Sequence, residues 1–166
     1  MLQPVVIDGI RTPIGKLNGA MKDIQPEEIA AFLLQKICER SHLDIRLLDA
    51  VILGQAKQSS DQPNIARLAA LMTKFPLEVQ AYTVHRQCGS GMQAVQNAAQ
   101  EIMCGYADFV LAGGIESMSN AQYYLREARR GYAVGNGILL DHNTESQPRS
   151  QPADQYGVLT MGMTAE

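Results

Sequence analysis

Cys88 stands in the stretch of the sequence whose residue types are best suited to covalent chemistry. The apolar run Val79–Val84 predicts a strand, and a helix-like segment begins shortly after Cys88-Gly89-Ser90-Gly91. A cysteine at the start of a helix faces unpaired backbone N–H groups and the positive end of the helix dipole, and both favour the nucleophilic thiolate. Gly89 and Gly91, which follow it, leave the sulfur open and let backbone N–H groups approach a ligand. The pattern therefore indicates a nucleophilic thiol.

A buried structural cysteine beside a glycine-rich turn is the alternative interpretation of Cys88, and the local pattern alone does not decide between the two. The helix dipole contributes only about 0.3–1 kcal/mol to a thiolate, so catalysis needs a second activating group. Cys38 and Cys104 lie within or at the end of predicted helices, and we expect both to be structural.

Composition excludes several classes of protein. The 166 residues include 14 Lys and Arg against 17 Asp and Glu, and this balance gives no basic face for nucleic acid. No apolar run approaches the roughly 20 residues of a membrane helix, and the N-terminus lacks the features of a signal or transit peptide. Three cysteines without a CxxC pattern argue against a disulfide framework or a zinc site. We expect a cytoplasmic protein with no nucleic-acid or membrane partner.

Strand-like and helix-like segments alternate along the first two thirds of the chain, which is typical of a layered α/β domain. The expected strands are residues 5–10, 50–53, 79–84 and 109–112, and the first is expected to be buried. The expected helices are residues 26–40, a short one after Pro63, and one after Gly91 that ends at Gly105. The last of these should present an apolar face made by Met92, Val95, Ala99, Ile102 and Met103. Residues 116–130 could contain a further helix, with Tyr124, Leu125 and Ala128 on its apolar face, before an irregular segment that begins at Gly131.

Six segments, in order along essentially the whole chain, resemble the thiolases, the acetyl-CoA C-acyltransferases and acetyltransferases. Each is weak alone, and their order and spacing carry the resemblance. They are Arg11-Thr12-Pro13-Ile14-Gly15, Val51-Ile52-Leu53-Gly54-Gln55, Asn64-Ile65-Ala66-Arg67, Cys88-Gly89-Ser90-Gly91-Met92-Gln93-Ala94, Ala112-Gly113-Gly114-Ile115-Glu116-Ser117-Met118-Ser119 and Met161-Gly162-Met163-Thr164-Ala165-Glu166.

This resemblance implies an α/β, thiolase-like layered fold with a mixed sheet flanked by helices. The fold would be incomplete: residues 1–118 would form one of two core domains, and 119–166 the truncated start of a loop domain. It also implies that Cys88 takes an acyl group from a 3-ketoacyl-CoA and passes it to CoA, or runs the reverse Claisen condensation. CoA is then a substrate, and no metal or organic cofactor is needed. Met161 matches a family Met that lines the acyl pocket, although a buried structural Met is the alternative.

Thiolases are dimers or tetramers, so the resemblance implies a homo-oligomer formed through the strand near Val79–Val84. The family's catalytic His, in a Gly-His-Pro motif, and its second Cys, in a Cys-x-Gly motif, have no counterpart among these residues. We therefore expect this chain alone to be inactive. His85 stands where many thiolases carry Asn, either as a tolerated replacement or as a group that tunes Cys88.

Two other hypotheses about the function of the chain remain open. A ketoacyl synthase or hydroxymethylglutaryl-CoA synthase relative would share the fold and a nucleophilic Cys, although the motif strings fit thiolases better. A non-catalytic thiolase-like module that binds acyl-CoA or lipid is the alternative from a different class. Acylation of Cys88 by acetyl-CoA separates an enzyme from a binder.

Overall fold

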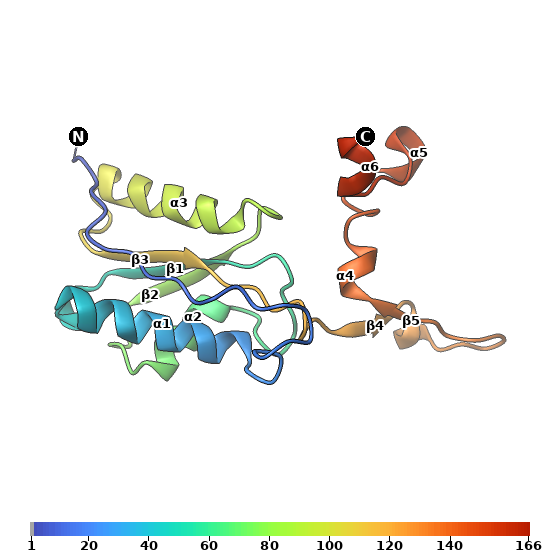
Figure 1. Ribbon diagram of the computed structural model, residues 1–166, viewed down its shortest axis with the longest axis horizontal. Coiled ribbons are helices and arrows are strands. Elements are labelled where there is room, and N and C mark those ends of the chain that lie inside the picture. The colour runs from blue at the N-terminus through green and yellow to red at the C-terminus, as the bar shows by residue number, and fades with distance from the viewer. Residues whose placement is uncertain (1) are drawn as a thin grey trace. The chain divides into compact units, whose positions relative to one another are not determined.

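The computed structural model describes residues 2–166 and divides into two compact units, one ending at Asn120 and one spanning Ala121–Glu166. The first unit contains a parallel sheet in the order β2-β1-β3. Helices α1 and α2 cover one face of this sheet and α3 covers the other (Figure 1). The strands are β1 (Ala50–Gly54), β2 (Gln80–Val84) and β3 (Val110–Gly114); the helices are α1 (Pro26–Ser41), the 3-10 turn Ile45–Leu47, α2 (Ile65–Met72) and α3 (Ser90–Cys104). The layered α/β fold expected from the sequence is confirmed.

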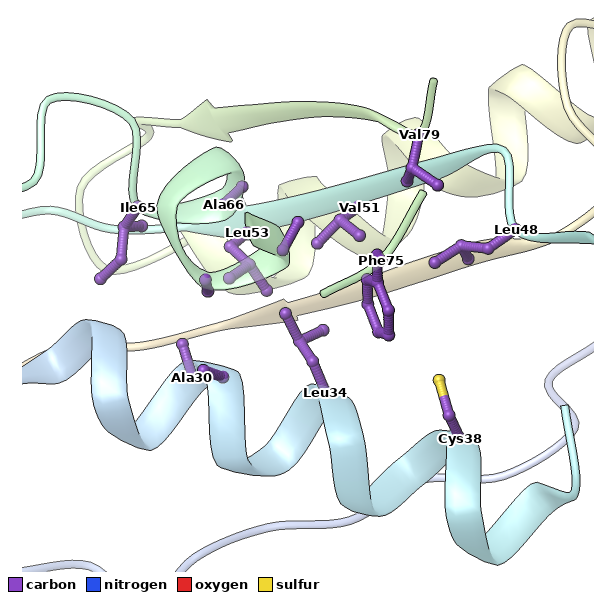
Figure 2. Close-up of a cluster of buried hydrophobic side chains, with 13 residues drawn as sticks. Ala30, Leu34, Cys38, Leu48, Val51, Leu53, Ile65, Ala66, Phe75 and Val79 are labelled. Atoms are coloured by element: carbon purple, nitrogen blue, oxygen red, sulfur yellow. The ribbon is translucent and has the colours of Figure 1, made fainter. Parts of the chain in front are cut away.

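The larger hydrophobic cluster fills the space between the sheet and the two helices α1 and α2 (Figure 2). Its centre is β1, a strand that is buried along its whole length. Val51 points to this cluster, and the next residue, Ile52, points to the opposite face, as the alternation of a strand requires. Both side chains are fully buried. The continuous apolar run 50–53 is thus explained by helices on both faces of the sheet.

Helix α3 meets the sheet through small residues. Ala94 and Ala98 are buried against Ile52, whereas Met92, Val95 and Met103 are exposed. The side of the helix that carries Met92, Val95 and Met103 is therefore not the side that packs on the sheet. In the sequence, the large apolar side chains of this helix are the most conspicuous. Alanines make the contact with the sheet because their small side chains let the helix lie close to the strands.

Helix ends follow their local signals. In α1, Gln25 and Glu28 form a capping box and Pro26 occupies the first turn. At the end of α3, Gly105 adopts a left-handed conformation with φ 75°, which glycine reaches at no steric cost. The expected helices of this unit and the strands 50–53, 79–84 and 109–112 all lie within one or two residues of the observed elements.

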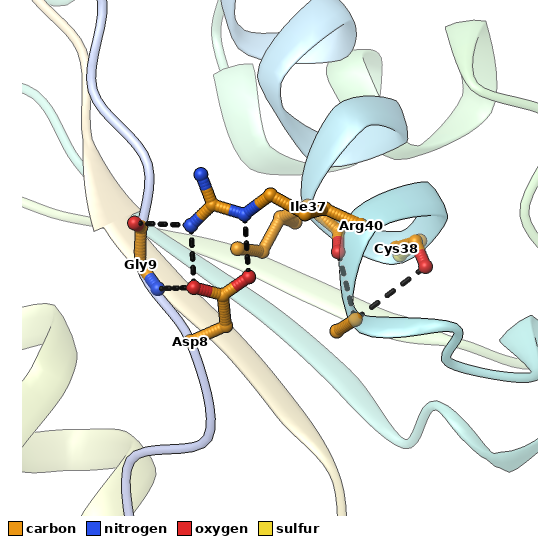
Figure 3. A network of polar contacts seen from close by, with 6 residues as sticks. Asp8, Gly9, Ile37, Cys38 and Arg40 are labelled. Atoms are coloured by element: carbon orange, nitrogen blue, oxygen red, sulfur yellow. Dashed lines mark hydrogen bonds and ion pairs between the residues drawn. The ribbon is translucent and has the colours of Figure 1, made fainter.

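The N-terminal segment departs from the expectation. Residues 5–10 form no strand, and Val5, Val6 and Ile7 are exposed, so the predicted buried strand is wrong. The segment is held instead by Arg40 of α1, whose Nε donates to Asp8 Oδ2 at 2.7 Å (Figure 3). An apolar run indicates that a segment can enter a sheet, but a strand also needs a neighbour to supply its ladder of hydrogen bonds.

In the second unit, β4 (Tyr123–Leu125) and β5 (Leu139–Asp141) pair antiparallel. The helix expected within 116–130 is therefore wrong: its region holds a strand and the 3-10 turn Ala128–Arg130. Tyr and Leu suit a paired strand as well as a helix, and so short a run cannot distinguish the two periods. The remaining elements are single turns: α4 (His142–Glu145), α5 (Ala153–Tyr156) and α6 (Met161–Ala165). Among residues 2–166, no helix has the length and apolar character needed to cross a membrane.

Candidate active site

The carboxyl ends of the three parallel strands lie side by side. Gly54 of β1 is in register with Val84 of β2 and with Gly114 of β3. Two further backbone bonds continue this alignment past the strands, from Gln55 N to Val84 O and from Ile115 N to Gly54 O, both 3.0 Å. Ligands of open α/β sheets bind at this edge, so the loops that follow the strands are where a site is expected.

Cys88 lies at this edge, in the loop between β2 and α3. It is exposed, and it immediately precedes Gly89, the N-cap of α3. Its thiol is therefore both accessible and close to the helix N-terminus, where the dipole favours negative charge. Cys38 is buried in the core, and burial raises the pKa of its thiol. Cys104 is exposed at the far end of α3, so it does not fill the core position that a structural role would give it.

The side chain of Ser90 closes the loop that carries Cys88. Its Oγ accepts a hydrogen bond from Arg86 N at 2.8 Å and donates one to Gln87 O at 2.6 Å. Gln87 has a φ of 49°, in the left-handed region that a non-glycine residue seldom occupies. The buried Ser90 hydroxyl thus bonds to both residues that precede Cys88 and stabilises a sharp turn. Nothing in the local sequence pattern indicates this role for Ser90.

Glu116, which follows β3, connects the loops at the same edge. Its carboxylate accepts hydrogen bonds from Ala56 N at 2.8 Å and Lys57 N at 3.1 Å, both in the loop after β1. Bonds from backbone N–H groups to a carboxylate are charge-assisted and strong. In the same loop, Gln55 is buried, and its Oε1 has no hydrogen-bond partner among the described residues. Neither Glu116 nor Gln55 was identified as a site residue from the sequence.

A line of polar contacts joins the Cys88 loop to the body of α3. Arg86 Nη1 donates to Gln93 Oε1 at 2.5 Å, and Gln93 Nε2 donates to Asn97 Oδ1 at 2.7 Å. Further along, Tyr82 of β2 donates to Glu101 Oε1 at 2.7 Å. Burial, and then the bond to Glu101, raises the pKa of Tyr82. This hydroxyl therefore stays protonated and available as a donor that connects β2 to α3.

The structure also describes the other residues that the sequence singled out. His85 is exposed, and in the part of the chain that the structure describes its ring shows no hydrogen bond to Cys88. Met161 begins α6 in the second unit and is exposed, so the buried structural alternative for it is not what the structure shows. Within residues 2–166, no group of three or more His, Cys, Asp or Glu side chains is placed to hold a metal ion.

Known proteins match the chain over its whole length. A family model for the thiolase N-terminal domain matches residues 4–166. Probable acetyl-CoA acyltransferases of Staphylococcus epidermidis and Staphylococcus aureus are 38% and 36% identical over 166 residues, which is all of this chain and 41% of each relative. The crystal structure of the Bacillus anthracis acetyl-CoA acetyltransferase superimposes with a TM-score of 0.80 and 37% identity, covering 89% of this chain and 40% of that chain.

The chain thus spans about two fifths of the length of the curated relatives it matches. The family match includes both the sheet and the loop that carries Cys88. Sequence motifs, layered fold and structural superposition all lead to one assignment: the chain belongs to the thiolase family.

Proposed function

We propose that Cys88 is the acyl-accepting nucleophile of a thiolase-type acyltransferase whose substrates are acyl-CoA and CoA. The observation that carries this proposal is the exposure of its thiol immediately before the N-cap of α3, at the carboxyl edge of a parallel sheet. The relatives named as acetyl-CoA acyltransferases and acetyltransferase support the substrate class. The first unit then supplies the nucleophile, and the second is the start of the loop domain expected over residues 119–166.

The half-reaction with acetyl-CoA is a thioester exchange. The Cys88 thiolate attacks the carbonyl carbon, the bond from that carbon to the CoA sulfur breaks, and CoA leaves with the proton that Cys88 gave up. With a 3-ketoacyl-CoA, attack at the ketone carbon breaks the carbon–carbon bond, and the departing acetyl-CoA carbanion takes that proton. In both cases the N-terminus of α3 stabilises the Cys88 thiolate that begins the reaction.

Turnover needs more than this nucleophile. Among residues 2–166, no acid or base forms a hydrogen bond with the Cys88 thiol, and removing the base from a nucleophile–base pair removes most of the rate enhancement. We therefore expect the 166-residue chain to accept an acetyl group slowly and to show no measurable thiolysis of acetoacetyl-CoA in the presence of CoA.

The test is intact-mass and peptide analysis of the chain after incubation with acetyl-CoA. One added acetyl group on the peptide that contains Cys88 is expected, and Cys88→Ser should abolish it. Cys104→Ser is the matched control, because Cys104 is also exposed and lies at the other end of the same helix. Equal acetylation of Cys88 and Cys104, or none at Cys88, contradicts the proposal. Binding of acetyl-CoA without acylation would instead support a non-catalytic module.

We also propose a homodimer formed through β2. This strand is at one edge of the described sheet, with β1 on its other side. An unpaired strand edge offers free N–H and C=O groups to a second chain.

A further inference from the structure

The backbone of Gly54, the last residue of β1, lies directly against the first peptide of α3. A Cβ placed on Gly54 would come within 2.2 Å of Ser90 C, 2.4 Å of Gly91 N and 2.5 Å of Ser90 O. Real Cβ atoms essentially never approach other heavy atoms closer than 3.0 Å. All three neighbours are backbone atoms, so no side chain can turn aside to make room.

A second glycine makes a similar but looser contact. A Cβ on Gly114, the register partner of Gly54, would lie 3.1 Å from Gly91 Cα and 3.4 Å from Gly54 O. By contrast, a Cβ on Gly113, one residue earlier in β3, would meet only Leu53 Cδ2 at 3.8 Å. The requirement for glycine is therefore local to the contact between the strand ends and the start of α3.

We propose that Gly54 is a positioning residue for Cys88: its missing side chain lets the first turn of α3 lie against β1 and so fixes the position of the thiol. The inference rests on the proposed function only in taking Cys88 as the reacting group. The mechanical link is Ser90, whose peptide contacts Gly54 and whose hydroxyl bonds to Arg86 N and Gln87 O. Any displacement of Ser90 is thereby passed to the two residues that precede Cys88.

The three cysteines allow the position of Cys88 to be tested within one molecule. Alkylation by iodoacetamide, followed by peptide mapping, gives the rate at Cys88 relative to the exposed Cys104. The buried Cys38 reports unfolding, because it reacts only when the core opens. If a residue merely stabilises the fold, its substitution should change the labelling of Cys38. It should leave the ratio of the Cys88 and Cys104 alkylation rates unaltered.

Gly54→Ala is expected to lower that ratio about two- to fivefold at neutral pH, the loss that follows when a thiolate no longer sits at a helix terminus. Cys38 should remain protected in this variant. Gly113→Ala is the matched control and should leave the ratio unchanged. An unchanged ratio in Gly54→Ala with Cys38 protected overturns the inference, and so does an equal change in Gly113→Ala.

If Gly54→Ala exposes Cys38, Gly114→Ala decides the question, because its 3.1 Å contact needs a shift of only a few tenths of an ångström. It should lower the ratio in the same direction by a smaller factor, and no change in that folded variant overturns the inference. Alkylation does not involve CoA. Failure of acetyl-CoA to acylate the unaltered chain therefore counts against the proposed function, while the ratio measures positioning separately.

Discussion

The hydroxyl of Ser90 is a single polar group that bonds to the backbone on the N-terminal side of Cys88. Ser90→Ala removes both of its hydrogen bonds and leaves Arg86 N without that acceptor. We expect the free energy of unfolding to fall by about 1–3 kcal/mol, because two hydrogen bonds of about 0.5–1.5 kcal/mol each are lost. Chemical denaturation measures this loss, and the rate of Cys88 alkylation should change with it.

Ser41→Ala is the control for this variant, since the Ser41 hydroxyl also bonds to a backbone carbonyl, that of Ile37 at 2.7 Å, but at the end of α1. It should leave Cys88 alkylation as it is. A Ser90→Ala protein with unchanged stability and alkylation would show that the loop is held by its backbone bonds alone.

His85 is the residue for which the sequence left two roles open. Its ring is exposed and shows no hydrogen bond to Cys88 in the described part of the chain, which favours a tolerated replacement of Asn. His85→Asn should therefore leave the alkylation rate of Cys88 unchanged at every pH at which it is measured. A displaced profile would show that the imidazole acts on the thiol, and the tuning role would then stand.

At the scale of single residues, the sequence predicted Cys88 and missed the groups that hold it. Cys88 can be proposed from the sequence because strand, glycines and helix follow one another in the chain, so its setting is local. Glu116 contacts backbone that is 59 and 60 residues away along the chain. Partners so distant leave no trace in spacing or periodicity. The close contact at Gly54 is hidden for the same reason.

At the scale of elements, predictions succeeded where an element carries its own signals. α1 has a capping box and an N-terminal proline, and α3 ends at a left-handed glycine. They failed where pairing decides the outcome. Tyr123–Leu125 is a strand because Leu139–Asp141 lies beside it, and residues 5–10 are not a strand because none of the described strands pairs with them.

The N-terminal segment is instead attached to α1 by one ion pair, and this attachment depends on pH. Hydrogen bonding from Arg40 lowers the pKa of Asp8 below its usual value. The ion pair is therefore formed above the ordinary carboxyl range and is lost as the pH falls through the lowered pKa of the folded state. Gly9 N donates to Asp8 Oδ1 at 2.8 Å, so its amide NMR signal should follow this titration.

Arg40→Gln should move the midpoint of the Gly9 titration upward, toward that of an unpaired aspartate. Lys22→Gln is the control: Lys22 pairs with the neighbouring Asp23, and its loss should leave the Gly9 midpoint in place. If Arg40→Gln leaves the midpoint unmoved, the guanidinium does not hold Asp8, and another contact must fix the segment.

At the scale of the whole molecule, the parallel sheet explains why one edge collects the polar loops. Parallel strands all end at the same side, so the loops after β1, β2 and β3 meet there although they are far apart in sequence. The same topology leaves β2 at the edge of the described sheet. One feature of the fold thus accounts for both the candidate site and the open strand edge through which we propose that two chains pair.

The backbone bonds of β2 identify which groups face that open edge. Gln80 N donates to Asp49 O, and Gln55 N donates to Val84 O, so residues 80, 82 and 84 direct their backbone groups toward β1. Alternation then turns the N–H groups of Ala81 and Thr83 outward. On the open side, Asn64 Nδ2 already donates to Ala81 O at 3.0 Å, so the free N–H groups are what a partner strand would use.

Ala81→Pro removes one outward N–H while keeping an extended backbone, which an edge strand tolerates. We expect the unaltered chain to be a dimer by light scattering after gel filtration, and Ala81→Pro to be a folded monomer by light scattering and circular dichroism. Ala81→Ser keeps the N–H and should remain dimeric. A monomeric unaltered chain would mean that β2 does not pair across two copies. A dimer that survives Ala81→Pro would mean the same, because pairing at this edge requires a hydrogen bond that proline cannot donate.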